Sequence, residues 1–314
     1  MDSSDSSNSE SVAPRESNSA SNEGCQNKTR SGRMDNGKLD KPEQLSNSAK
    51  YFRIRDRKSL NIEYIDADNE SELFERLAQD FSIKEYEHLF IKNLSRYQIL
   101  ELDNLPDIKS QLNNKEKTIA NYLQKVLVND PLKTGVKETL TDSFVNYLLS
   151  KLEFNDYPFL LNLQEEYGFV IGRKKVTAKI EFTIERDNSV FCLDEGKHLH
   201  GITATSEYGE CQIAAEILSC AYSNFEGARS HTKEMDQTIF AVRVIGSRFT
   251  FYKAFIKAEY LRSLPYGFPP NNLGVKILRL PSIQQSEYGY DYADEKVRPL
   301  IIEFFLRLRE TISR

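Results

Sequence analysis

The chain has 314 residues, and its 42 Lys and Arg against 47 Asp and Glu give a formal net charge of −5 at pH 7. This balance excludes a protein whose whole surface attracts nucleic acid or anionic membrane, so any contact with nucleic acid must be local. No stretch has the ~18 consecutive apolar residues of a membrane span, and the amino terminus lacks the basic and apolar segments of a signal peptide. With only four cysteines and no CxxC pair, we expect an intracellular protein, nuclear or cytoplasmic, with reduced thiols and no secretion by a standard signal peptide.

Residues 1–49 are rich in Ser, Asn, Asp, Lys and Glu and have almost no large apolar side chains. Such a segment buries too little surface to offset the entropy of ordering, so we predict a disordered tail. Its basic cluster, Lys28–Arg33, is either a nuclear-import or phosphate-contacting patch or, as is usual for short basic runs, a solvated part of the tail.

Residues 50–130 are predicted to form a mainly helical amino-terminal module. Tyr51–Ile54 and Ile62–Ile65 alternate like short strands, whereas the apolar residues between Leu73 and Phe81 recur at helical spacing. Lys115–Val128 has the pattern of a helix with one apolar side. No motif in this module points to chemistry.

Residues 131–314 show an order of elements typical of an α/β domain. The patterns predict a helix, two strands, a second helix, two more strands and a final amphipathic helix. The corresponding segments are Glu138–Leu152, Thr177–Glu185, Ser189–His198, Ser206–Phe225, Thr238–Ile245, Arg248–Phe255 and Pro299–Ile312. We therefore expect a mixed central β-sheet flanked by helices.

The tripeptide Glu195-Gly196-Lys197 is the most informative motif of the chain, because it closes an apolar strand with two charges. Side chains alternate along a strand, so Phe191, Leu193, Glu195 and Lys197 point to one side. A buried charge without a partner costs several kcal/mol, about 3–5 where one member of a pair is lost. The end of this strand is therefore expected to open onto a wet cleft, a metal ion or a paired network.

An acid-x-Lys element that follows an acid-bearing strand and precedes a helix carrying Gln212 resembles the PD-(D/E)XK, or restriction-endonuclease-like, nuclease superfamily. The resemblance covers residues 132–264, a little under half of the chain. It implies a restriction-endonuclease-like core in which two acids on adjacent strands hold a divalent metal, and a lysine orients or activates the attacking water. Glu195 matches the second acid and Lys197 the lysine. Mg²⁺ is the cofactor that the resemblance implies, and carboxylate oxygens are its usual protein ligands.

The first acid of the pair is less well defined by the sequence. The family has a Pro-Asp pair near the start of the preceding strand, and this chain has Ile180-Glu181 in its place. Glu181 is the candidate metal ligand, with Glu185 and Asp187 as substitutes, although this face also has the composition of an ordinary solvent-facing side. A carboxylate from the first helix is common in the family, and Glu138 is the candidate for it.

Gln212 and Glu216 are spaced to lie together on the second helix, on the side opposite its apolar residues. A glutamine on the equivalent helix reaches the catalytic site in several families of the superfamily, and Gln212 resembles that residue. The alternative is an exposed polar stripe, which the spacing favours for Glu216.

Other motifs give weaker hypotheses. His198 and His200 have the spacing of a His-x-His metal pair, but the other two histidines of the chain offer no further ligand. The glycine-containing and basic segment Tyr167–Lys175 is predicted to be a loop that either contacts phosphates or is only solvated. Three basic residues of the late strand pair are candidates for a phosphate-contacting track, namely Arg243, Arg248 and Lys253.

The resulting hypothesis is a Mg²⁺-dependent phosphodiester hydrolase, an endonuclease or exonuclease, in which Glu195, Lys197 and Gln212 are catalytic. Glu181, Glu195 and Glu138 are the expected metal ligands, and nucleic acid is the expected partner, with DNA favoured over RNA. Two alternatives stay open. One is a catalytically inactive module of the same fold that binds nucleic acid or protein, and the other is an interaction scaffold unrelated to nucleases. The oligomeric state is not defined by the sequence.

Overall fold

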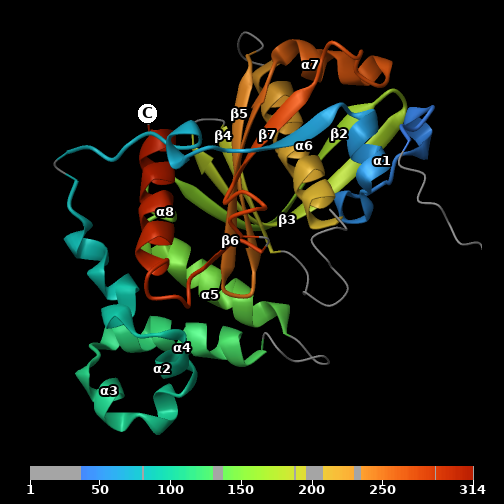
Figure 1. Cartoon of the computed structure of the whole chain (residues 1–314). Helices are drawn as coiled ribbons and strands as arrows, with labels where there is room; N and C mark the ends of the chain where they lie inside the picture. The colour runs from blue at the N-terminus through green and yellow to red at the C-terminus, as the bar shows by residue number, and fades with distance from the viewer. Residues whose placement is uncertain are drawn as a thin grey trace, which may run out of the picture. The chain divides into compact units, whose positions relative to one another are not determined.

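The computed structural model describes residues 37–79, 81–129, 137–186, 189–195, 208–229, 235–286 and 288–313. Residues Asn36–Arg314 form one compact unit. A mixed β-sheet lies at its centre, with helices on both faces (Figure 1). The expected α/β class, with a mixed sheet flanked by helices, is therefore confirmed. No helix in the described ranges is long and apolar enough to cross a membrane.

The sheet contains eight strands in the spatial order β1-β7-β6-β5-β4-β3-β2, and the short β8 pairs with β6. The strands are β1 (Ile62–Asp66), β2 (Leu160–Ile171), β3 (Lys174–Arg186), β4 (Ser189–Glu195), β5 (Gln237–Ile245), β6 (Arg248–Ile256), β7 (Val275–Leu280) and β8 (Tyr290–Asp291). The pairs β4–β5 and β1–β7 are parallel, and the other pairs are antiparallel. Strands β1, β7, β5 and β4 therefore run in the same direction, and their carboxyl ends lie at one edge of the sheet.

Helices cover both faces of the sheet, and α2, α3 and α4 lie beyond α5 (Figure 1). The α-helices are α1 (Ile54–Ser59), α2 (Arg96–Leu100), α3 (Pro106–Gln111), α4 (Asn114–Asn129), α5 (Glu138–Lys151), α6 (Tyr208–Arg229), α7 (Ala258–Ser263) and α8 (Arg298–Ser313). One hydrophobic core joins α4, α5 and α8 to the sheet, and a second core joins α6 and α7 to the opposite face. In Figure 1, α8 and α6 lie on opposite sides of the strands.

Helix α6 is enclosed on nearly all sides. Between Gly209 and Phe225 its side chains are buried except for Gln212 and Ser223, which are half-buried. A helix that is buried all round has no solvent face for charged residues. Its polar side chains must therefore pair with other groups or serve a site.

The structure corrects several sequence predictions near the amino terminus. Tyr51–Ile54 is not a strand, because a 3₁₀ turn ends at Tyr51 and helix α1 begins at Ile54. The helix expected between Leu73 and Phe81 is wrong, because residues 73–79 contain no helix. A short 3₁₀ turn, Glu70–Glu72, precedes them. The predicted boundary of the disordered tail at residue 49 is also wrong, because Leu45 and Ala49 are buried in the second core.

Strand β1 was expected, but not its place in the sheet. It pairs in parallel with β7, a strand that the sequence patterns did not predict. The segment Tyr167–Lys175 is also not a loop, since it forms the end of β2, a tight turn and the start of β3. Gly172 sits in that turn with φ +57°, a left-handed conformation that glycine adopts at little cost.

Candidate active site at the amino end of helix α6

The parallel strands β4 and β5 are joined through helix α6, which begins beyond the carboxyl end of β4 and returns to the start of β5. In α/β sheets, ligands bind in the crevice outside the carboxyl ends of parallel strands. Unpaired N–H groups and the helix dipole also make a helix amino terminus favourable for anions. The end of β4 and the start of α6 therefore form a candidate ligand-binding position at this edge of the sheet.

Glu195 is the last residue of β4, and its backbone pairs with Val244 of β5. Glu181 lies on the neighbouring antiparallel strand β3, whose register sets Phe182 opposite Leu193. Continuing that register by one residue would set Asp194, rather than Glu195, opposite Glu181. The two predicted acids are thus on adjacent strands but one residue out of register, and a one-residue offset places side chains on opposite faces of a regular strand pair.

The side chain of Glu181 is half-buried and accepts a hydrogen bond from Nε2 of Gln164, at 3.3 Å. Lys179 donates to the same amide group, with 3.1 Å between Nζ and Oε1 of Gln164. The substitute acid Glu185 accepts a hydrogen bond from the Tyr167 hydroxyl at 3.1 Å. Each of the two acids is therefore half-buried and accepts one side-chain hydrogen bond, Glu181 from Gln164 and Glu185 from Tyr167.

Several predicted residues lie outside the described ranges. These are Lys197, His198 and His200, which follow β4, and Asp187, which precedes it. The side chain of Glu195 belongs to the same category, because only its backbone is described. The predicted roles of these residues stay predictions.

Gln212 and Glu216 form a pair within α6, in which Nε2 of Gln212 donates to Oε1 of Glu216 at 2.9 Å. Glu216 is fully buried, with 0% of its surface exposed. The alternative of an exposed polar stripe is therefore wrong for Glu216. A buried carboxylate that orients a half-buried amide gives Gln212 a fixed position close to the start of the helix.

Glu138 is the first residue of α5 and is exposed. Helix α5 packs into the core on the α8 side of the sheet, whereas α6 belongs to the core of the other face. Glu138 and Gln212 therefore come from different layers, and both can approach one ion only at the edge of the sheet.

A buried ionic network that sequence reasoning missed surrounds the first turn of α6. Nε of Arg279, on β7, lies 2.8 Å from Oε1 of Glu210, and the side chains are only 3% and 11% exposed. Asp66, at the end of β1, extends the network with 3.9 Å between its Oδ1 and Nη1 of Arg279. The three residues come from three separate elements, so their spacing in the sequence carries no pattern that would have revealed them.

Two tyrosines pack against this network. The Tyr64 hydroxyl donates to the backbone oxygen of Glu210 at 2.5 Å, and the rings of Tyr64 and Tyr252 meet edge to face at 5.7 Å. Burial, and then the negative charge of Glu210, raises the pKa of Tyr64 well above its usual value. Burial and Glu210 also raise the pKa of Tyr252 to about 12. Both hydroxyls are therefore neutral near pH 7, and that of Tyr64 acts as a hydrogen-bond donor.

Arg243 completes the cluster from strand β5. In the sheet, Arg243 pairs with Asp194 of β4 on one side and with Thr250 of β6 on the other. The guanidinium group lies against Gly209 in the first turn of α6, where a Cβ atom would fall 2.1 Å from Nη2. Glycine is thus required at position 209 for the guanidinium group to take this place.

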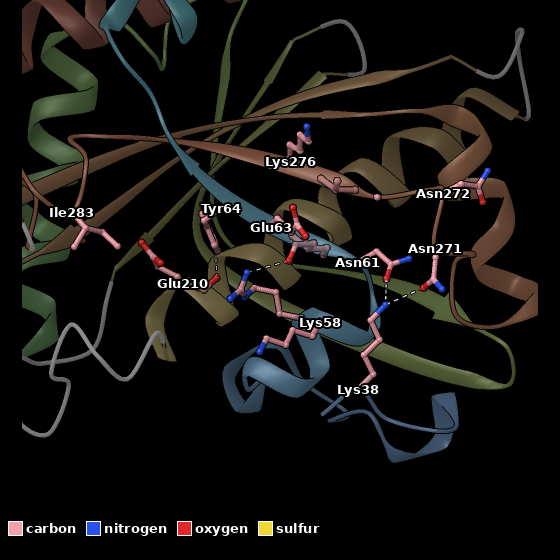
Figure 2. A pocket seen from close by; sticks show the side chains of 14 residues that line it. Lys38, Lys58, Asn61, Glu63, Tyr64, Glu210, Asn271, Asn272, Lys276 and Ile283 are labelled. Atoms are coloured by element: carbon pink, nitrogen blue, oxygen red, sulfur yellow. Dashed lines mark hydrogen bonds between the residues drawn. The ribbon is translucent and has the colours of Figure 1, made fainter. Parts of the chain in front are cut away.

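A pocket of about 900 Å³ runs from this cluster along α1, β1 and β7. Four cationic side chains line it against two acidic ones: Lys38, Arg57, Lys58 and Lys276 against Glu63 and Glu210. Figure 2 shows Glu210 and Tyr64 at one end of the pocket and the hydrogen-bonded Lys38, Asn61 and Asn271 at the other. The pocket thus links the amino end of α6 to a predominantly basic wall.

Within the described residues, no three His, Cys, Asp or Glu side chains come together as a group that would hold a metal ion. No family model matches the chain, and no curated protein matches it at a significant level.

Proposed function

We propose that the chain is a metal-dependent phosphodiester hydrolase of the restriction-endonuclease-like type, acting on nucleic acid, with DNA favoured over RNA. The observation that carries the proposal is the succession of β3, β4 and α6. Glu181 and Glu195 lie on adjacent antiparallel strands, and helix α6 carries Gln212, which is held by Glu216.

In this proposal, Glu195 and an upstream acid, Glu181, bind Mg²⁺, which would supply positive charge to the developing phosphorane and activate a water molecule. Lys197, two residues after Glu195, orients that water without taking a ligand position. Gln212 supports the site through its amide group. The basic pocket next to Glu210 gives the nucleic acid backbone a local positive surface, which the negative net charge of the whole chain does not provide.

The proposal is tested by incubating the purified chain with labelled single-stranded DNA, double-stranded DNA and RNA, in the presence of Mg²⁺ or of a chelator. We expect cleavage that requires the metal and that falls by about a hundredfold or more in Lys197→Ala and Glu195→Gln. Lys125→Ala is the matched control, because Lys125 is an exposed lysine of α4, in the layer opposite α6.

Equal cleavage by Lys197→Ala and wild type, with both folded, would contradict the assigned role of the lysine. Binding of the oligonucleotides without any cleavage would favour the inactive module over the enzyme. Asp194→Asn is included in the series because continuing the register from Phe182 and Leu193 would set Asp194 opposite Glu181. A loss of activity in Asp194→Asn and not in Glu195→Gln would move the second metal ligand to Asp194.

A further inference from the structure

Arg243 is a buried cation whose guanidinium group lacks hydrogen-bond partners among the described residues. Only 9% of the residue is exposed, and its Nε and Nη2 atoms are buried without a hydrogen bond to any residue in the described ranges. A guanidinium group keeps its charge at every accessible pH, so it cannot avoid the cost of burial by losing a proton. An anion at this point would remove that cost.

The surroundings of Arg243 contribute further positive potential at the same position. The guanidinium group rests on Gly209, in the first turn of the 22-residue helix α6. Backbone N–H groups without intrahelical partners and the positive end of the helix dipole lie at this turn. The guanidinium group of Arg243 and the positive end of the helix dipole therefore meet at the first turn of α6. The nearby carboxylate of Glu210 is already paired with Arg279.

We propose that Arg243 and the amino end of α6 form a phosphate-binding subsite that holds one phosphodiester group of a nucleic acid substrate. The planar guanidinium fork matches two oxygens of a phosphate group, and the helix end provides N–H donors for the others. The inference rests on the proposed function for the identity of the ligand. It does not rest on it for the existence of the anion site, which follows from burial and geometry.

The position of the subsite agrees with a role in substrate binding. Arg243 pairs across the sheet with Asp194, the residue before Glu195, so the anion would lie next to the end of β4. Glu195 pairs with Val244, which packs in the core on the α8 side, so the subsite lies on the α6 face of the sheet, in register with Asp194. Arg243 is in this sense a substrate-binding residue and not a proton donor.

The test measures anion binding without turnover. Thermal unfolding of the full chain is followed in a chelator with increasing inorganic phosphate, against sodium chloride at equal ionic strength, for wild type, Arg243→Met and Gly209→Ala. We expect phosphate to raise the Tm of wild type more than chloride does. Arg243→Met should weaken phosphate binding by about tenfold to a hundredfold, because charge-assisted hydrogen bonds are lost. Gly209→Ala should weaken it as well, since the new methyl group displaces the guanidinium group.

A wild-type protein whose Tm responds equally to phosphate and chloride would overturn the subsite. Retention of wild-type affinity by Arg243→Met would do the same. Where Arg243→Met does not fold, phosphate affinity is measured for Arg243→Lys and Gly209→Ala. Both variants keep a positive charge, but the first lacks the guanidinium group and the second displaces it. Wild-type affinity in both of these variants would contradict the proposal. Lys125→Ala serves as the control that should bind as wild type does.

The source of the phosphate is decided by a second titration with a short DNA oligonucleotide, also in a chelator. We expect the oligonucleotide to bind more tightly than inorganic phosphate, and Arg243→Met to weaken its binding by about tenfold or more. Phosphate binding without any gain from the oligonucleotide would overturn the assignment to nucleic acid. Because no cleavage is measured, failure of the hydrolase proposal and failure of the subsite give different results.

Discussion

The guanidinium group of Arg279 on β7 forms a buried ion pair with Glu210 in the first turn of α6, at 2.8 Å between Nε and Oε1. The contact joins a strand near the carboxyl terminus to the helix that follows β4. It therefore fixes the amino end of α6 relative to the sheet edge where the candidate active site lies.

Breaking this ion pair is expected to destabilise the fold strongly. Arg279→Met keeps the length of the side chain but leaves the carboxylate of Glu210 buried without its partner, at a cost of about 3–5 kcal/mol. Urea denaturation of the variant and wild type measures the difference. The exposed pair between Lys109 and Asp103 is the control, and Lys109→Met should leave the unfolding free energy unchanged. A loss in Arg279→Met below about 1 kcal/mol would be contrary to the expected role of the pair.

Arg298, the first residue of α8, is expected to be equally important for stability. It is fully buried, and its guanidinium group donates hydrogen bonds to the backbone oxygens of Tyr292, Phe90, Leu94 and Ala293, at 2.7–3.1 Å. Arg298→Met leaves several buried carbonyl groups without a donor, each worth about 1–3 kcal/mol. We expect a fall in the urea midpoint of unfolding, and Arg298→Lys should restore only part of it. An unchanged midpoint in Arg298→Met would show that these carbonyls find other donors.

Stability is expected to fall in mild acid because of His88. Burial, and then the positive charge of Lys115, lowers the pKa of this imidazole below its usual value of 6.5. Below that pH the unfolded chain therefore binds a proton that the folded chain does not, so the stabilisation is complete above about pH 6.5 and is lost as the pH falls toward the folded pKa. The measurement is the unfolding free energy from about pH 7.5 to about pH 5. His88→Gln should show a shallower decline than wild type, and parallel curves would contradict the assignment.

Most of the α/β architecture was predictable from local patterns. Helices α4, α5 and α8 and strands β3, β5 and β6 were expected close to their observed bounds, because each combines a regular apolar period with a clear break at its ends. Strand β2 was missed for a physical reason. It lies at the edge of the sheet, and its residues 163–166 are exposed, so alternation between apolar and polar residues is not required there.

The candidate site was only partly predictable. The alternation of a strand relates Glu195 to Lys197, but no local rule reports that Glu216 is buried, since that depends on how the sheet and α1 enclose α6. The ion pair between Glu210 and Arg279 joins residues from distant parts of the chain, and its strand β7 had not been recognised. Arg243 was selected as a basic residue of a strand pair, whereas its burial against Gly209 follows from tertiary packing alone.

Carboxylates of β3 and β4 are predicted to share one divalent ion at the end of the sheet. Crystals of the protein soaked with Mn²⁺, a substitute for Mg²⁺ that anomalous scattering identifies, test it directly. We predict one ion whose ligands include carboxylate oxygens of Glu181 and Glu195, at about 2.0–2.6 Å. An ion bound elsewhere, or carboxylates separated so that no ion can bridge them, would contradict the claim.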